Sequence, residues 1–273
     1  MIAKGLYRLF VVFGMCLWLG AMAGPAAASV TLTDQNAGVV FDPLSPAGLT
    51  SWSVDGVEHL NRQWFWYRTG SSGPEHSIDT LTLNTTLTTD TNFDGNVDTL
   101  YLKYLGADLS VELTIFLRGG LSGSHRSDMT ENLRLTNLSS NVLDLHFFQY
   151  TDFDLNGNGS DDTVQILGGN TARQTDRSAY VAETVGAFTA DHYRADLAST
   201  LLAALEDASP TTLLDAAGPV MGDVGWVFQW DKKINPGQSF LITKSKNFMP
   251  EPATLAFLGL GSLGLLRAWR RRR

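Results

Sequence analysis

The chain has 273 residues, of which 44% are hydrophobic and 18% are charged, and its formal net charge is −8 at pH 7. Its single cysteine, Cys16, lies in an apolar N-terminal run, which excludes a disulfide scaffold and a cysteine metal site in the rest of the chain. The acidic balance excludes nucleic acid as a partner and favours divalent cations or basic partners.

The first 28 residues are typical of a secretory signal peptide. A positive n-region precedes an apolar segment over residues 9–23, and a run of three alanines follows. The apolar segment is short for a membrane span of about 20 residues, which favours cleavage over a permanent anchor. We therefore expect export by the Sec translocase and cleavage by signal peptidase, with Ala26, Ala28 and Ser29 at the cleavage site.

A central segment, residues 29–248, remains between this signal peptide and a C-terminal tail. Two of the 20 basic residues lie in the signal peptide and five lie in the tail, whereas only one of the 28 acidic residues, Glu251, lies in either. The central segment therefore holds 13 basic and 27 acidic residues, a net charge of −14. A length of about 220 residues suits one undivided all-β domain.

Apolar and polar residues alternate with period two along most of this segment. From Leu109 to Leu117 every second residue is aliphatic, which is typical of a strand with one buried face. Turn residues such as Asp94-Gly95 and Pro236-Gly237 separate such runs. The pattern predicts an antiparallel β-sandwich. Its expected strands are 30–32, 80–87, 99–105, 109–117, 132–138, 142–150, 163–167, 179–182, 225–230 and 240–243.

One segment, residues 191–208, predicts a helix instead. Leu197, Leu201, Leu202 and Leu205 fall on one side of a helix, and Ser209-Pro210 would end it. We therefore expect one amphipathic helix beside the strands.

Aromatic residues gather at 64–67 and 226–230. Alternate aromatic side chains on a strand can form a platform for sugar rings, and Trp64 and Trp66 are the candidates. The alternative is that they fill the core, because successive side chains of a strand point to opposite faces and large aromatics are usually buried. The sequence leaves both readings open.

Two oxygen-rich loops resemble the first half of a calcium loop. In the first, oxygen side chains and Gly95 stand at the expected positions, but Tyr101 replaces the twelfth-position glutamate; in the second the same position holds Thr163. Such sites would bind Ca²⁺ weakly, in the submillimolar to millimolar range. The alternative is a plain hairpin turn, which uses the same residue types. The candidate ligands are Asp90, Asn92, Asp94, Asn96 and Asp98 in the first loop and Asp152, Asp154 and Asn156 in the second.

No catalytic motif is present. The five histidines do not make a metal-binding spacing, and neither a nucleophile elbow nor a phosphate loop occurs. A pair of carboxylates suited to glycoside hydrolysis would arise by chance among so many acids. We therefore expect no enzymatic activity.

The last 25 residues form a tail with four ordered features. Met249-Pro250-Glu251-Pro252 is followed by Ala253-Thr254, then by an uncharged segment that ends at Leu266, and then by arginines. A helix over residues 253–269 would reach about 25 Å, slightly less than a bilayer core of about 30 Å. The positive-inside rule holds the arginines in the cytoplasm and leaves the preceding domain outside. The terminal cluster is Arg270, Arg271, Arg272 and Arg273.

These residues, in this order at the C-terminus, resemble a PEP-CTERM sorting signal, the tail that exosortase processes in Gram-negative bacteria that make exopolysaccharide. The resemblance covers residues 249–273, and the segment from Trp226 to Phe240 is similar to the closing hairpin of exported PEP-CTERM proteins of unknown activity. The resemblance implies export, transient anchoring in the inner membrane, and processing by exosortase near Pro250, Glu251 and Pro252. The mature protein would then be at the cell surface or outside the cell.

The first functional hypothesis is a non-enzymatic structural or adhesive protein of the envelope or exopolysaccharide matrix, with Ca²⁺ as the one cofactor considered. Bound Ca²⁺ would bridge its acidic face to acidic polysaccharide. A lectin-like carbohydrate-binding module that uses Trp64 and Trp66 is the alternative, and a polysaccharide-processing enzyme is the third hypothesis.

Overall fold

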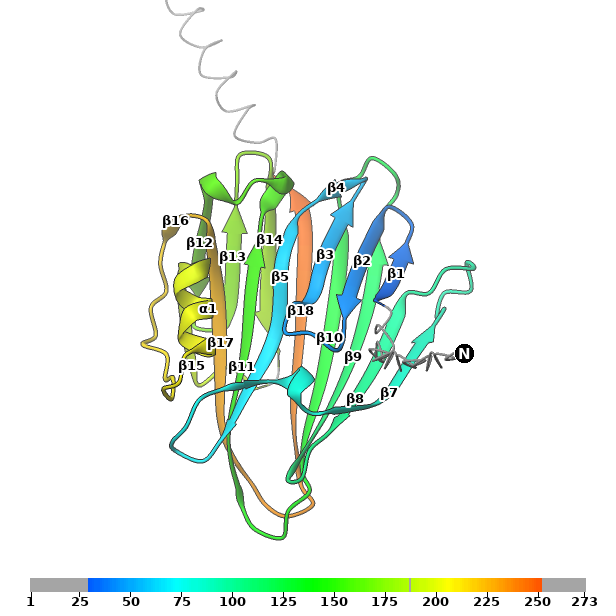
Figure 1. The fold of residues 1–273 in the computed structure, drawn as a ribbon. Coiled ribbons are helices and arrows are strands. Elements are labelled where there is room, and N and C mark those ends of the chain that lie inside the picture. Colours follow the sequence, from blue (N-terminus) through cyan, green and yellow to red (C-terminus); the bar gives the residue numbers. More distant parts are fainter. Residues whose placement is uncertain (1–28, 187, 252–273) are drawn as a thin grey trace, which may run out of the picture.

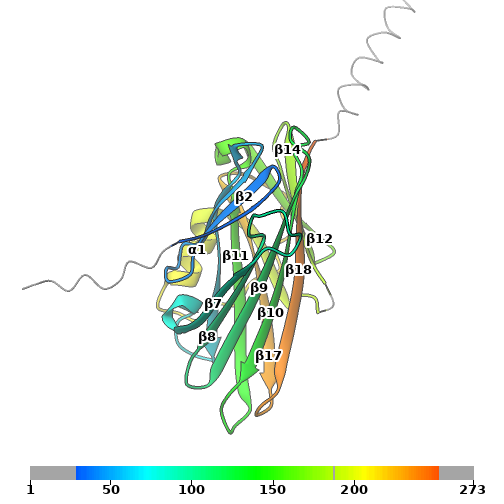
Figure 2. The same cartoon turned by 90° about the vertical axis from the view of Figure 1, so that its right-hand side faces the viewer.

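The computed structural model describes residues 29–186 and 188–251 (Figure 1). Two mostly antiparallel β-sheets pack face to face as a sandwich, which confirms the predicted fold class (Figure 2). The predicted signal peptide, residues 1–28 with Ala26 and Ala28, lies outside the described residues, as do Pro252, the expected membrane helix 253–269 and the terminal arginines. In the described ranges, none of the helices has the length and apolar character needed to cross a membrane.

The first sheet has the strand order β1-β2-β3-β5-β11-β17-β15, and the short strands β4 and β6 pair with β3 and β5. One contact in it is parallel, between β3 and β5 where Gln63 faces Gly48 and Leu49. Its strands are β1 (Val30–Asp34), β2 (Ala37–Asp42), β3 (Gly48–Val54), β4 (Val57–Glu58), β5 (Leu60–Thr69), β6 (His76–Ser77), β11 (Leu143–Phe153), β15 (His192–Leu197) and β17 (Val224–Ile234).

The second sheet has the order β16-β12-β13-β14-β18-β10-β9-β8-β7, so β18, the last strand of the sequence, lies in its centre. Its strands are β7 (Thr82–Thr89), β8 (Thr99–Leu105), β9 (Leu109–Gly119), β10 (Ser127–Asn137), β12 (Asp162–Leu167), β13 (Thr171–Thr175), β14 (Ala179–Val185), β16 (Val220–Gly222) and β18 (Ser239–Pro250). The described helices are η1 (Ile78–Thr80), η2 (Leu155–Gly157), η3 (Gly159–Asp161) and α1 (Ala198–Glu206).

Each of the ten predicted strands overlaps a strand of the structure, but the predicted helix is too long. Residues 192–197 form β15, which pairs with β17, and the helix begins only at Ala198. The prediction counted Leu197 among the leucines of the helix. Leu197 is instead the last strand residue and is exposed, whereas Leu201 and Leu205 are buried. Pairing with the edge of β17 decides the conformation of residues 192–197, and periodicity alone does not show it.

Aromatic side chains fill much of the space between the sheets. Phe153 stacks on Trp226 with ring centroids 5.7 Å apart and an interplanar angle of 7°, and Phe65 stacks on Phe147 at 5.8 Å. Complete burial of one such side chain contributes about 1.5–3 kcal/mol to stability. Packing of this kind holds a domain that has no cysteine after Cys16.

Four charged side chains lie in the middle of this core and form a closed ion network. Lys244 and Lys246 of β18 contact Glu131 of β10 and Glu183 of β14, and none of the four side chains is more than 1% exposed. The Lys246 ammonium is 2.7 Å from Glu131 and 3.5 Å from Glu183, and Lys244 is 3.2 Å from Glu183. Two positive and two negative charges balance each other.

The first sheet completes this network with neutral donors. Gln63 donates to Glu131 at 2.5 Å, Gln149 donates to both oxygens of Glu183, and the Trp226 indole donates to Glu183 at 2.9 Å. Although burial raises the pKa of Glu131, the charges of Lys244 and Lys246 outweigh it and hold the pKa below its usual range. The Glu131 carboxylate is therefore assigned as charged, and the network joins the two sheets across the core.

Candidate metal centre

The loop after β11 brings acidic residues to one end of the sandwich. Asp152 is the penultimate residue of β11 and Asp154 follows the strand, so one residue separates them along an extended chain and their side chains share a face. The backbone then turns sharply through Asn156 and Gly157, which have φ values of 58° and 71°. Left-handed backbone of this kind favours Gly and Asn, which explains their presence here.

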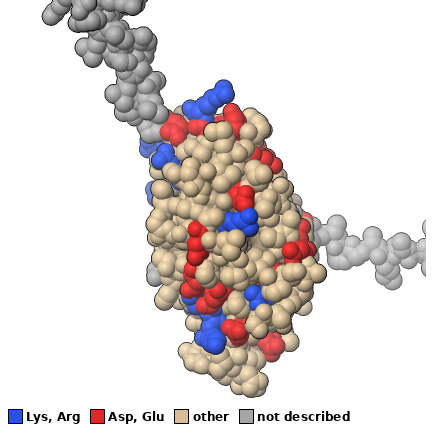
Figure 3. Space-filling model, turned by 90° about the vertical axis from the view of Figure 1, so that its left-hand side faces the viewer, with Lys and Arg blue, Asp and Glu red and all other residues tan. Residues whose placement is uncertain are grey.

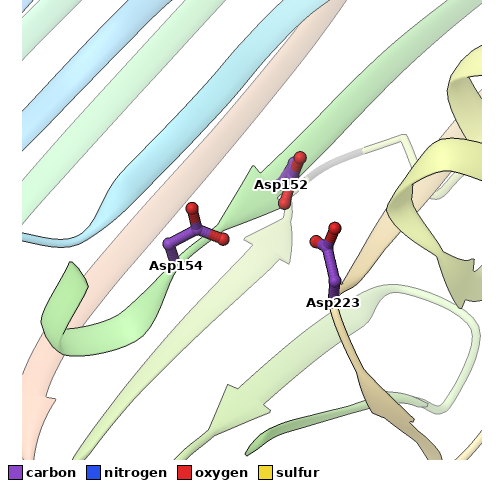
Figure 4. A group of neighbouring side chains, drawn as sticks. All are labelled: Asp152, Asp154 and Asp223. Atoms are coloured by element: carbon purple, nitrogen blue, oxygen red, sulfur yellow. The ribbon is translucent and has the colours of Figure 1, made fainter. Parts of the chain in front are cut away.

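A third carboxylate comes from a distant part of the sequence. Asp223 lies between β16 and β17, and β17 pairs with β11 so that Gly225 faces Asp152. Figure 4 shows the side chains of Asp152, Asp154 and Asp223 pointing toward a common space. One carboxylate oxygen from each of the three residues lies within 4.8 Å of the other two, a spacing that one cation can bridge.

The three carboxylates differ in burial and in bonding. Asp152 is only 4% exposed, Asp154 is half-buried and Asp223 is exposed, so the group extends from the interior to the surface. One oxygen of Asp152, Oδ2, accepts hydrogen bonds of 3.0 Å from Asn61 and from the Tyr150 hydroxyl. Its other oxygen, Oδ1, is buried and has no hydrogen-bond partner among the described residues. A buried oxygen left this way costs about 1–3 kcal/mol.

Without a bound cation, the ionised state of this carboxylate group is electrostatically unfavourable. Burial raises the pKa of Asp152 to about 7, and the negative charges of Asp154 and Asp223 also raise it. Burial and the charge of Asp223 raise the pKa of Asp154. Within the described part of the chain, no Lys, Arg or His nitrogen lies within 4.0 Å of the three carboxylates. Three carboxylates without a positive neighbour are the donor set that hard divalent cations bind.

Gly159 of η3 lies directly against the group. A Cβ at this position would be 2.2 Å from Asp154 Oδ1 and 3.5 Å from Asp223 Oδ1. The close approach explains why glycine occupies this place in the loop, because a side chain would push Asp154 away from Asp223.

The structure thus brings together two of the ligands predicted in the second loop. The side-chain amide nitrogen of the third, Asn156, donates to Asp176 at 2.7 Å and to Ser178 at 2.9 Å, and its role as a ligand stays a prediction. The calcium-loop template placed it as a ligand, but the left-handed turn directs its side chain toward the β13–β14 connection. Asp223 was missed because it belongs to no loop motif and becomes a neighbour only through the pairing of β11 with β17.

The first predicted loop has a different arrangement. Asp90 accepts hydrogen bonds from the backbone of Phe93 and Gly95, and Asp94 accepts one from Asn96. Asp98 is buried and accepts from the backbone and hydroxyl of Thr91. These carboxylates do not form a group of three within 4.8 Å in the described chain, and Asn92 donates to Asp34 and Asp94. The side chains of this first loop stabilise a turn. Binding of Ca²⁺ to the first loop stays a prediction.

The sugar platform predicted at Trp64 and Trp66 is wrong. The two residues are 1% and 2% exposed, so neither ring can stack on a sugar. Trp64 packs against Gly48 and Tyr104 and donates to Asp79, while Trp66 lies beneath the guanidinium of Arg62. The neighbouring strand β3 and the segment around η1 cover these tryptophans. The alternative prediction, that Trp64 and Trp66 fill the core, is therefore the correct one.

Acidic side chains also dominate one face of the surface. Figure 3 views the molecule from the side of α1 and β16, and acidic groups cover more of this face than basic groups do. Asp223 is the exposed member of the carboxylate group, so the group opens to solvent. A field of this sign attracts cations.

A family model for the PEP-CTERM protein-sorting motif matches residues 250–273. The chain carries a PEP-CTERM sorting motif. The PEP-CTERM motif indicates an exported protein that is anchored at the membrane during sorting, and it makes an exosortase the processing partner. It includes Pro250 and Glu251 of the described residues. No curated protein sequence matches the chain significantly.

The solved structures similar to the sandwich domain include a glucoamylase and a cyanobacterial protein. A bacterial glucoamylase complexed with acarbose has a TM-score of 0.54 and 12% identity over 87% of this chain. This chain spans 34% of that glucoamylase. The Slr1438 protein from Synechocystis sp. PCC 6803 has a TM-score of 0.50 and 10% identity, with 90% of this chain and 100% of that one covered. At such identities the similarity shows a shared fold alone.

Proposed function

We propose that this protein is a structural or adhesive component of the cell envelope or exopolysaccharide matrix whose sandwich domain binds one Ca²⁺ ion at Asp152, Asp154 and Asp223. The observation that carries the proposal is the buried Oδ1 of Asp152, which has no partner among the described residues and belongs to a group of three converging carboxylates. The sorting motif supports the location, because an exported protein meets cations outside the inner membrane. The proposed role includes no catalytic step.

The donor set favours Ca²⁺ over other cations. Ca²⁺ takes six to eight oxygen ligands in a flexible geometry, whereas Zn²⁺ prefers nitrogen and sulfur ligands and Mg²⁺ requires a near-ideal octahedron. Three carboxylates supply the charge, and water would complete the coordination on the side of Asp223, which is exposed. The ion would join the end of β11 and the loop before η2 to the β16–β17 connection, which is far from them in the sequence.

Calorimetric titration with CaCl₂ tests the site directly. We expect the protein to bind one Ca²⁺, and Asp223→Asn to weaken binding by about tenfold or more, because it removes a charged oxygen ligand while keeping the side-chain shape. Asp94→Asn is the matched control, since it makes the same change in the first loop and should leave this titration unchanged. Equal binding by the wild type and Asp223→Asn would contradict the proposed site.

A carbohydrate ligand is the second candidate, at a different place from the one predicted. The outer face of the second sheet has a shallow groove of about 290 Å³ across β9, β10 and β18. Its polar side chains can bond to sugar hydroxyls, and the fold shared with the acarbose-bound glucoamylase is compatible with this ligand class. The groove is lined by Glu112, Thr114, Asn132, Leu133, Arg134, Leu241, Ile242 and Thr243.

A glycan array that includes the exopolysaccharide of the host tests the groove. If sugars bind there, Asn132→Ala should reduce the signal by about tenfold, because a buried polar contact to a ligand is lost. Binding should persist in EDTA, since the groove lies on β9, β10 and β18, and none of these strands carries a member of the carboxylate group. If Asn132→Ala binds glycans as strongly as the wild type does, the ligand binds outside this groove.

A further inference from the structure

The folded domain contains the beginning of the sorting motif. Strand β18 ends at Pro250, which is also the first residue of the motif, and Pro250 lies in register with Ala179 of β14. The backbone N–H of Glu251 donates to the carbonyl of Ser178 at 2.8 Å. The strand β10 on the other side ends its pairing at Phe248, so β14 alone holds the last described residues of the chain.

Side chains reinforce this attachment on the outer face of the sheet. Glu251 Oε1 lies 3.6 Å from Nη2 of Arg173 on β13, and the Glu251 side chain is only 18% exposed. The Arg173 guanidinium lies over the ring of Tyr180, 5.0 Å from its centroid. The Tyr180 hydroxyl in turn donates to the sulfur of Met249 at 3.3 Å. The glutamate of the motif is therefore bonded to its own domain through main chain and side chain.

Pro250 is held on the opposite face. It lines a cavity of about 180 Å³ at the end of the sandwich, together with His59 and Phe248. The His59 and Phe248 rings line this cavity, and their centroids lie 4.1 Å apart. Pro250 and Glu251 thus follow the alternation of β18, with one side chain directed inward and the other outward.

We propose that the domain binds the beginning of its own sorting motif, and that exosortase reaches the Pro-Glu-Pro segment only after the end of β18 separates from β14. The inference rests on the proposed processing of this protein by exosortase. A processing enzyme must bind its substrate backbone in its active site. A backbone segment that is paired with β14 cannot bind to that enzyme at the same time. Local opening of the strand end then sets the rate of processing.

Pulse-labelling of the full-length precursor in the host, followed by mass spectrometry of the C-terminus, measures this rate. Arg173→Gln leaves the motif intact and removes the charge that holds Glu251, so we expect processing about two- to fivefold faster. Arg118→Gln makes the same change on β9, which pairs with neither β14 nor β18, and should process at the wild-type rate; Arg118 is exposed.

A disulfide provides the opposite test. Tyr180 and Met249 face each other in the register of β14 and β18, and the chain has no other cysteine outside the predicted signal peptide. Tyr180→Cys with Met249→Cys should join the strand end to β14 in the oxidising periplasm and slow processing roughly tenfold, with recovery on adding a reductant. The serine double variant at the same positions controls for the lost side chains.

The outcomes separate the two proposals. Equal rates for the wild type, Arg173→Gln and the oxidised cysteine variant would overturn the docking of the motif while leaving processing itself intact. A wild-type chain that keeps its terminal arginines indefinitely would instead remove processing by exosortase. Faster processing of Arg173→Gln together with slower processing of the oxidised variant supports the inference.

Discussion

Replacing Lys246 with methionine should destabilise the domain by about 3–5 kcal/mol, the usual cost of leaving one buried charge without its partner. The substitution removes one of two cations and leaves Glu131 and Glu183 buried beside Lys244 alone. Urea unfolding of residues 29–251, followed by tryptophan fluorescence, measures the loss. Most of the tryptophans of this domain are buried, so their emission reports on the core.

Lys103→Met is the matched control for this experiment. Lys103 pairs with Glu112 at 3.2 Å on the outer face of the second sheet, and both side chains are about a third exposed. The same substitution there should cost less than about 1 kcal/mol. Adding Glu131→Gln to Lys246→Met should recover roughly 1–3 kcal/mol, because charge balance returns while Gln63 keeps a bonding partner. Similar losses for Lys246→Met and Lys103→Met would show that the buried network is not cooperative.

Calcium should stabilise the domain strongly near pH 8 and weakly near pH 5. The pKa of Asp152 is raised to about 7 in the folded state, so between its unfolded value and about pH 7 the folded state binds more protons than the unfolded state. Without a cation, stability therefore falls as pH rises through this range. Ca²⁺ requires the ionised carboxylates, so it stabilises above about pH 7 and competes with protons below.

Thermal unfolding in EDTA and in millimolar Ca²⁺ over this pH range measures the effect. With Ca²⁺ at a hundred times its Kd, we expect about 2.7 kcal/mol of added stability near pH 8. Asp152→Asn should remove the calcium response and stabilise the EDTA-treated domain near pH 8, because it removes the buried charge. Asp162 is also buried, its pKa is raised to about 7, and it accepts hydrogen bonds from Leu155 and Gln174. The stability of the Asp152→Asn variant should therefore still depend on pH. A calcium response independent of pH would contradict the role of Asp152.

The loop motifs illustrate how far local sequence can locate a site. Asp152 and Asp154 were found because a calcium-loop spacing follows a predicted strand, and the structure places both in the carboxylate group. The same template also selected Asn156 and the whole first loop, since Asp, Asn and Gly serve tight turns equally well. Asp223 could be added only once the pairing of β17 with β11 was known.

The buried network shows the same limit in the core. Lys244 and Lys246 fall on the apolar phase of β18, between Ile242 and Phe248, and Glu183 falls between Val181 and Val185. Charged residues at the buried positions of a strand are visible in the sequence and indicate a buried network. Their pairing is not visible there, because the network spans three strands that meet only in the folded sheet. Trp64 and Trp66 were ambiguous for a related reason, because alternation tells which residues share a face but not whether that face is covered.

The sequence by itself determined the mainly β fold and the sorting motif, since alternation, turn residues and a terminal motif are all local patterns. Tertiary structure alone decided which carboxylates converge, which tryptophans are buried and how Glu251 contacts Arg173. These outcomes depend on strand order, and strand order is set by packing among segments that are far apart in the chain.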